Sequence, residues 1–140
     1  MADYQHLYDT VLAFIEERYK GAPDGAAGVI LENDEIIIGT APDYYNHGVS
    51  VCHETGAFLE AYKRDIPIKA SMCLYKDETD QVFILPPCGV CRERLRDHGT
   101  NIVAAVPSND GVNKFEMISL EQLCPHDWVT AYENQKKNSS

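Results

Sequence analysis

Basic residues are scarce in this sequence. Its 140 residues include 12 Lys and Arg against 22 Asp and Glu, which gives a formal net charge of −10. A protein that binds nucleic acid or an anionic membrane normally offers a basic surface, because neutralising phosphates supplies much of the affinity. The one local excess, Arg92, Arg94 and Arg96, is interrupted by Glu93 and Asp97, and we interpret it as a solvated helix face. We therefore expect no nucleic acid and no membrane as partners.

Long apolar runs and a signal peptide are also missing. Apolar stretches such as Ile36–Ile38 are too short to cross a bilayer and are typical of buried strands. The chain opens with Asp3 ahead of a polar helix, without the basic start and apolar segment of a secretory signal. We expect a cytoplasmic protein. In that reducing compartment five cysteines, an odd number, favour metal binding or core packing over disulfides.

Hydrophobic periodicity and turn residues divide the chain into helices and strands. Leu7, Val11 and Ile15 recur every four positions and indicate an amphipathic first helix. The expected order is helix, two strands, helix, strand, helix, two strands and helix. The ranges are 4–20, 26–31, 35–39, 53–64, 68–75, 88–98, 102–106 and 114–118, then a short helix opened by the capping box Ser119-Leu120-Glu121-Gln122. Residues 82–85 are expected to be a short extended piece.

This order predicts an α/β fold of three layers, α-β-α, with a central mixed five-stranded sheet covered by helices. The last two strands are separated only by residues 107–113, whereas a parallel pair needs a crossover of a dozen residues or more. We therefore expect those two strands to be antiparallel. No repeat or linker interrupts the chain, so we expect a single domain over residues 1–140, with 134–140 as a polar, frayed tail.

Three cysteines and a glutamate stand in a pattern typical of a catalytic zinc site. Glu54 follows Cys52 by two residues, and the Pro87-Cys88-Gly89-Val90-Cys91 segment lies further along the chain. Thiolates are preferred zinc ligands, and a catalytic zinc takes three protein ligands and a water. Cysteines three positions apart in a helix project to one side. We expect one Zn²⁺ per chain on the three cysteines, with Glu54 as the group that moves protons.

Other uses of these cysteines remain open. A closed structural zinc site needs a fourth ligand, for which His53, Cys73, Cys124 and a distant histidine are candidates. The Cys-x-x-Cys segment alone is typical of a thiol redox pair, although a third cysteine and an adjacent glutamate have no use in one. Cys73 and Cys124 are otherwise expected to be small, buried core residues.

The Cys52-x-Glu54 and Pro87-Cys88-x-x-Cys91 segments resemble the signature of the cytidine deaminase superfamily. The similarity extends to Gly25-Ala26-Ala27 and covers about residues 4–125. A cysteine as first ligand and an antiparallel last pair of strands are similar to the branch that acts on free nucleosides, which includes cytidine and blasticidin S deaminases. The resemblance implies a cytidine deaminase-like fold, a small-molecule nucleoside substrate, and a homotetramer or homodimer with sites at subunit interfaces.

The resemblance also implies a reaction. In the superfamily a zinc-bound hydroxide attacks C4 of cytosine, a glutamate protonates N3, and ammonia leaves. This gives Glu54 the proton transfer and the three cysteines the metal, with Pro87 and the backbone of His53 facing the base. We expect a cytidine deaminase-like aminohydrolase that converts a cytosine nucleoside, or an analogue of one, to the uracil form.

Some positions differ from the pattern of ordinary cytidine deaminases. Their Asn-x-Glu pair, which holds the sugar hydroxyl, corresponds to Ala41 and Asp43, so ribose recognition is weakened. An aromatic residue before the Gly-Ala-Ala strand is replaced by Ala22. An arginine after the catalytic glutamate, which donates to the thiolates, is replaced by Thr55, and a glutamine by Glu93.

These losses leave the partner of the sugar unassigned. Asp43, Tyr44 and Tyr45 precede Cys52 in a loop and are expected to line the substrate pocket, the alternative being plain surface residues. Further along, Trp128 and Tyr132 either cover a site or pack on the domain.

Two other functions also stay open. One is a blasticidin S-type antibiotic deaminase, and the other is a non-catalytic, zinc-stabilised nucleoside-binding module, in which the carboxylate of Glu54 would have no use.

Overall fold

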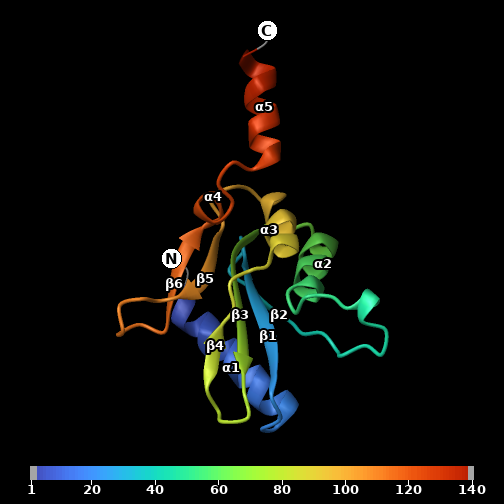
Figure 1. Cartoon of the computed structure of the whole chain (residues 1–140), viewed down its shortest axis with the longest axis vertical. Coiled ribbons are helices and arrows are strands. Elements are labelled where there is room, and N and C mark those ends of the chain that lie inside the picture. Colours follow the sequence, from blue (N-terminus) through green and yellow to red (C-terminus); the bar gives the residue numbers. More distant parts are fainter. Residues whose placement is uncertain (1–2, 139–140) are drawn as a thin grey trace.

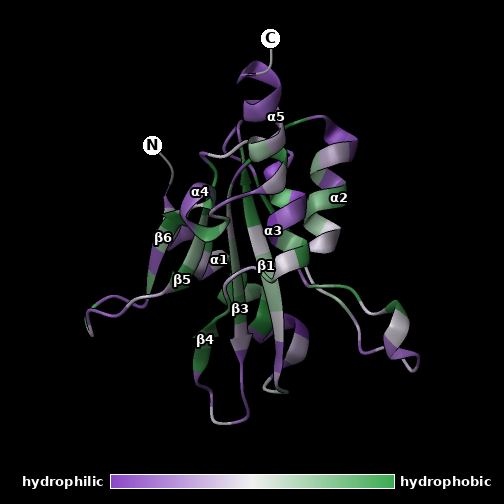
Figure 2. Cartoon of the chain, turned by 45° about the horizontal axis from the view of Figure 1, so that its top comes forward, coloured by the Kyte–Doolittle hydropathy of each residue, from purple (hydrophilic) through white to green (hydrophobic). Residues whose placement is uncertain are grey.

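A mixed β-sheet forms the centre of the chain, which a computed structural model describes over residues 3–138 (Figure 1). Its strands are β1 (Asp24–Leu31), β2 (Ile36–Gly39), β3 (Ile68–Lys76), β4 (Val82–Ile84), β5 (Val103–Pro107) and β6 (Phe115–Ser119). They lie in the order β2-β1-β3-β5-β6, and β4 pairs with β3 outside this path. Hydrophobic residues concentrate on β1 and β3, in the interior of the sheet (Figure 2). The expected five-stranded sheet therefore gains a sixth, short strand at residues predicted to be extended.

Strand directions follow from the lengths of the connections. β1 pairs antiparallel with both β2 and β3, whereas β3 and β5 are parallel and are joined by a crossover that contains a helix. β5 and β6 are antiparallel, with Val103 opposite Ser119 and Pro107 opposite Phe115. The predicted antiparallel last pair is confirmed, because the short connection of residues 108–114 leaves no length for a crossover.

One face of the sheet is covered by α1 (Tyr4–Tyr19). Leu7, Val11 and Ile15 are almost completely buried there against β1 and β3, as the four-residue spacing predicts. The helix begins at Asp3, whose carboxylate accepts a hydrogen bond from the backbone N–H of His6 at 2.9 Å. This helix forms the first of the three predicted layers.

The other face is covered by α2 (Thr55–Arg64) and α3 (Gly89–Arg96). Phe58 of α2 and Leu95 of α3 belong to one buried cluster that includes residues of β1 and β3. The sheet therefore lies between two helical layers, which confirms the three-layer fold. The predicted ligands lie just before α2 and at the start of α3, so the packing of these helices on the sheet sets the geometry of the candidate site.

The C-terminal part contains two helices where the sequence predicted one. Ser119 caps α4 (Leu120–Leu123) by accepting from the backbone N–H of Gln122 at 3.3 Å, as the capping box predicts. Pro125 and the positive φ of His126 (59°) then end that segment, and α5 (Trp128–Asn138) extends away from the rest of the chain (Figure 1). Residues 134–138, expected to be a frayed tail, continue α5, and residues 139–140 lie outside the described part.

The arginines of α3 lie on a face that is partly solvated, as expected, with Arg94 exposed and Arg92 and Arg96 half-buried, and they also make hydrogen bonds that the sequence did not indicate. Each guanidinium donates to a neighbouring segment, which the sequence could not indicate because the partners lie far along the chain. Arg92 donates to the carbonyls of Pro87 and Leu123, Arg94 to Thr55 Oγ1, and Arg96 to the carboxylate of Asp127.

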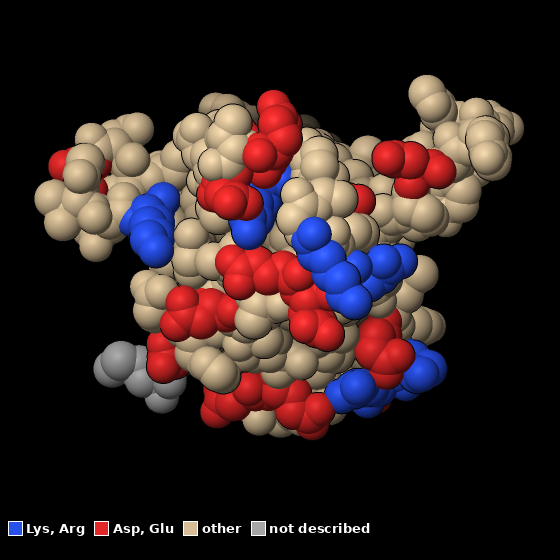
Figure 3. Space-filling model, turned by 90° about the horizontal axis from the view of Figure 1, so that it is seen from below, with Lys and Arg blue, Asp and Glu red and all other residues tan. Residues whose placement is uncertain are grey.

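Charges of both signs are interspersed on the face of the molecule seen from below. Figure 3 shows acidic side chains among lysines and arginines there, and no broad basic area on the described residues of that face. Within residues 3–138, no helix combines the length and the apolar character that a membrane span requires.

Candidate active site

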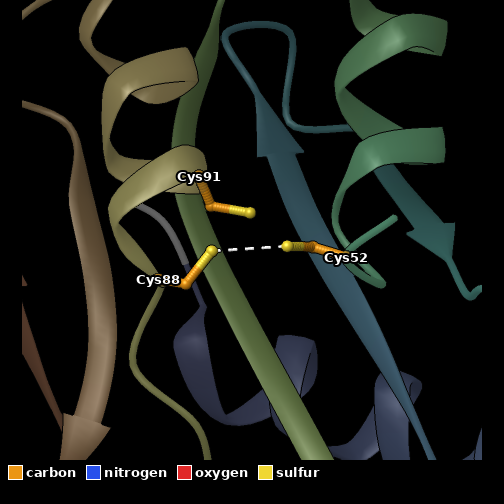
Figure 4. Close-up of side chains that lie close together, drawn as sticks. All are labelled: Cys52, Cys88 and Cys91. Carbon is orange, nitrogen blue, oxygen red and sulfur yellow. Dashed lines mark hydrogen bonds between the residues drawn. The ribbon is translucent and has the colours of Figure 1, made fainter. Parts of the chain in front are cut away.

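Three cysteines from two helices meet above β3 (Figure 4). Cys52 lies just before α2, Cys88 occupies the position before the first residue of α3, and Cys91 follows in the first turn of α3. Their sulfur atoms all lie within 4.8 Å of one another, and the Cys52 and Cys88 sulfurs are 3.3 Å apart. Two thiolates on one tetrahedral zinc lie roughly 3.8 Å apart, given a zinc–sulfur bond of about 2.3 Å. The three residues therefore fit a single thiophilic metal ion.

Cys88 is the thiol most ready to ionise. Its partial burial opposes ionisation, but hydrogen bonds from the backbone N–H of Cys91, from the neighbouring thiols and from the backbone N–H of Val90 together lower its pKa. These backbone groups belong to the start of α3, where N–H groups lack partners within the helix and favour a negative charge. The start of α3 thus favours the thiolate form of Cys88.

The other two thiols are harder to ionise. Burial raises the pKa of Cys52, as does its hydrogen bond with Cys88. Burial also raises the pKa of Cys91, and the nearby carboxylate of Glu54 raises it further. Such thiols lose their protons when a divalent cation binds between them, because the cation stabilises the thiolates directly. The donor set is therefore suited to a metal ion and poorly suited to three free thiolates.

Glu54 is not one of the converging ligand groups, but it lies close enough to Cys52 and Cys91 for its charge to raise the pKa of both thiols. Glu54 is 5% exposed, and its carboxylate raises the pKa of the Cys91 and Cys73 thiols. A buried carboxyl group beside a metal site is positioned to exchange protons with a water or substrate held there. The structure thus brings Glu54 together with Cys52, Cys88 and Cys91.

Cys73 was expected to be a small core residue, and the sequence did not indicate its contact with Glu54. It is buried on β3, and this burial together with the Glu54 carboxylate raises the pKa of its thiol. Cys73, Cys124 and His53 lie outside the group of converging ligand atoms in the described chain. None of these candidates joins the converging set in the described residues, and three protein ligands are the number that a catalytic zinc takes.

The side chain of His53 lies against the sheet, between the start of β1 and the end of β2. Its Nδ1 accepts from the backbone N–H of Ala41 at 3.2 Å, and its Nε2 lies 3.9 Å from a carboxylate oxygen of Asp24. Pro87 is buried, and its carbonyl accepts from Arg92 Nε at 2.8 Å, which fixes the backbone just before Cys88.

The other predicted substrate contacts lie on the outside of the chain. Asp43, Tyr44 and Tyr45 are exposed in the segment between β2 and α2, which projects from the body and contains the short 3₁₀ helix η1 (His47–Val49) (Figure 1). Trp128 is also exposed, and its Nε1 donates to Glu93 of α3 at 2.9 Å. Within one chain, the structure does not place these side chains against the three cysteines.

Proteins of known structure indicate the family to which this chain belongs. No protein-family model matches the chain, and no curated protein sequence matches it. Among solved structures, the cytidine deaminase from Bacillus anthracis is 37% identical, with a TM-score of 0.84 over 94% of this chain and 93% of that one. The chain belongs to the cytidine deaminase superfamily. It is therefore a cytidine deaminase-like aminohydrolase.

Two more distant structures support the cytidine deaminase fold alone. The cytidine deaminase from Mycobacterium leprae is 19% identical with a TM-score of 0.70, over 90% of this chain and 100% of that one. The enzyme from Burkholderia pseudomallei is 18% identical with a TM-score of 0.68, over 89% and 98%. The three-layer arrangement thus persists where the sequences have diverged widely.

Proposed function

We propose that this protein catalyses the zinc-dependent hydrolytic deamination of a cytosine nucleoside or a cytosine-nucleoside analogue, with release of ammonia. The observation that carries the proposal is the convergence of Cys52, Cys88 and Cys91 beside the buried carboxyl group of Glu54. The similarity to the cytidine deaminase from Bacillus anthracis supports the choice of base.

The proposal gives separate roles to the zinc ion and to Glu54. A zinc ion held by the three cysteines supplies the acidity that makes a water nucleophilic near neutral pH. The attacking oxygen bonds to C4 of the base, and the C4–N4 bond breaks. Glu54 takes a proton from the attacking water and delivers it to N3, then transfers the second proton to the departing amine, so that water and cytosine give uracil and ammonia.

Charge balance supports the same assignment. A zinc ion with three thiolates carries a net charge of −1, so nearby donors are needed to keep it acidic. The start of α3 provides backbone N–H groups at Cys88. Ordinary cytidine deaminases have an arginine at the position of Thr55. Here Arg94 reaches that position from α3, donating to Thr55 Oγ1 at 2.9 Å, and we assign it the same compensating role.

The non-base part of the substrate is recognised differently from ribose in ordinary cytidine deaminases. Ala41 is buried and has no polar side chain, and its backbone N–H donates to Nδ1 of His53. This leaves Asp43 and the two tyrosines of the projecting loop as the polar groups nearest in sequence. The same observation favours modified nucleosides, including a blasticidin S-type substrate, as the second candidate class.

The proposed active form is a homotetramer or homodimer. Cys88 is exposed in the single chain, and apolar side chains near the site and on α2 are also exposed: Val51, Leu59, Tyr62 and Val90. A second copy packed over these residues would cover the metal site and exclude water from the reaction. The cavity of about 500 Å³ between α3, α4 and α5 contains none of the three cysteines and is not the proposed active site.

An ammonia-release screen tests the proposal. Reduced protein is expected to contain one zinc per chain and to release ammonia from at least one of cytidine, deoxycytidine, cytosine, N4-modified cytidines and blasticidin S. Glu54→Gln should keep the zinc and the fold while kcat falls roughly 10²- to 10⁴-fold, since it lacks a group that accepts a proton.

The outcomes separate the alternatives. Zinc with nucleoside binding and no ammonia would indicate a binding module, whereas reduced protein without metal would indicate a thiol redox protein. Undiminished turnover in Glu54→Gln would assign the proton transfer to another group.

A further inference from the structure

The segment between Thr40 and Cys52 leaves the end of β2, projects from the body, and returns at the first metal ligand (Figure 1). Its first residue after Thr40, Ala41, is buried, while residues 42–51 are exposed. The backbone N–H of Ala41 donates to Nδ1 of His53 at 3.2 Å. This one hydrogen bond joins the start of the projecting segment to the residue between Cys52 and Glu54.

No neighbouring hydroxyl can replace this hydrogen bond. The hydroxyl of Thr40 lies 3.4 Å from Nδ1, but it has one proton, which it donates to the carbonyl of Gly25 at 2.8 Å. The hydroxyl of Tyr19, 2.6 Å from Thr40 Oγ1, then acts as donor to that oxygen. The Ala41 N–H is therefore the donor that His53 Nδ1 accepts.

The imidazole is also held on its other side. A Cβ atom added at Gly25 would lie 2.6 Å from the carbonyl oxygen of Leu74 and 3.1 Å from His53 Nε2, so the imidazole packs closely against a glycine that has no room for a side chain. The carboxylate of Asp24 faces Nε2 at 3.9 Å. The ring thus lies between the start of β1 and the end of β2, and it is not one of the converging ligand groups.

We propose that His53 is a positioning residue whose side chain closes the base of the 42–51 loop, and so sets the affinity for the non-base part of the substrate. The proposal rests on the proposed function for the identity of the site. With both ends of the loop joined, Asp43, Tyr44 and Tyr45 occupy a restricted range of positions before substrate binds. Without the Nδ1 acceptor, the buried Ala41 N–H has no partner, and the loop base opens.

Three variants of His53 test the proposal. His53→Asn places an acceptor oxygen close to the position of Nδ1, whereas His53→Gln places its polar atoms near Nε2, and His53→Ala removes both. His6→Ala, in an exposed turn of α1, is the matched histidine control. The measurements are amide hydrogen exchange over residues 42–51, zinc content, and KM and kcat on the best substrate from the ammonia-release screen.

In His53→Ala and His53→Gln, exchange in the loop is expected to become about tenfold faster and KM to rise about tenfold, with kcat within threefold and zinc retained. His53→Asn and His6→Ala should resemble the wild type. If His53→Ala does not fold, the difference in loop exchange and KM between His53→Asn and His53→Gln tests the positioning role.

Unchanged loop exchange in the Ala or Gln variant, or equal effects of Asn and Gln, would overturn the positioning role. A wild type that releases no ammonia would instead refute the proposed function, and the exchange measurement would still test the loop contact by itself.

Discussion

His98 illustrates at the residue scale how this fold uses a histidine far from the cysteines. It lies just after α3, and its Nδ1 accepts from the backbone N–H of Ile68 at the start of β3 at 3.1 Å. Partial burial lowers the pKa of His98 below its usual 6.5, although the charge of Asp97 acts in the opposite direction. A protonated ring could not accept at Nδ1, so the neutral form is the one that holds β3 to α3.

The sign of the pH dependence follows from that lowered pKa. Above about pH 6.5 the ring is neutral in both the folded and the unfolded chain, and its contribution to stability is fully present. As pH falls below 6.5 toward the pKa of the folded state, the unfolded chain binds the proton first, and the free energy of unfolding decreases. His98→Asn, which keeps an acceptor oxygen without titrating, should give a shallower slope of unfolding free energy between pH 7 and 5. Urea denaturation at several pH values measures it, and an unchanged slope would assign the titration to other groups.

Spacing predicted which cysteines converge, because Cys88 and Cys91 share a helix face and Cys52 has a glutamate two positions later. The residues around them were not predictable in the same way. Arg94 meets Thr55 across two helices, and Cys73 meets Glu54 between a strand and a helix. These pairs depend on how helices pack on the sheet, and a single sequence has no local signal for such contacts.

At the scale of elements, the approach of α2 to the end of β2 determines where the first ligand lies. A Cβ atom at Gly39 would lie 2.5 Å from the carbonyl oxygen of His53 and 3.0 Å from the backbone nitrogen of Ala57. Both neighbours are backbone atoms at the start of α2, which cannot rotate away as a side chain can. The absence of a side chain at Gly39 therefore lets the segment that carries Cys52 and Glu54 dock on the sheet.

Gly39→Ala should lower the free energy of unfolding by about 1–3 kcal/mol, the usual range for overpacking. The displaced α2 should also weaken zinc retention against a chelator. Gly56→Ala is the matched control, because nothing lies within 4 Å of the added atom and the residue is helical. It should leave stability unchanged or raise it by up to about 1 kcal/mol. Urea denaturation and chelator competition measure both effects, and equal behaviour of the two variants would show that α2 is free to shift.

Helices and strands with clear periodicity were predictable to within one or two residues, as α1 and β3 show. The helix boundaries of the C-terminal region were less predictable. Pro125 and the positive φ of His126 divide one expected helix into α4 and α5. The polar composition of residues 134–138 suggested fraying, yet they extend α5, because helix formation there depends on residues earlier in the same helix.

At the scale of the whole molecule, the exposed apolar residues of α2 predict association. Leu59 is 64% and Tyr62 83% exposed on a helix that begins at the metal site. Tyr62→Glu should shift the proposed oligomer toward monomers and lower activity, because the charge would be buried at the contact. Val112→Glu is the matched control, since Val112 is similarly exposed in the loop between β5 and β6. Light scattering coupled to size exclusion measures the mass, and a monomeric wild type would contradict the oligomeric proposal.

The attachment of α5 has a mechanical consequence. Trp128 and Asp127, at the start of α5, are bound to Glu93 and Arg96 of α3, the helix that carries Cys88 and Cys91. We therefore expect a force or a bulky fusion at the C-terminus to act through α5 on α3, the helix next to two of the three sulfurs. We expect tags and immobilising linkers at this end to disturb the three-cysteine site more than the same additions at the N-terminus, because α1 packs on the opposite face of the sheet.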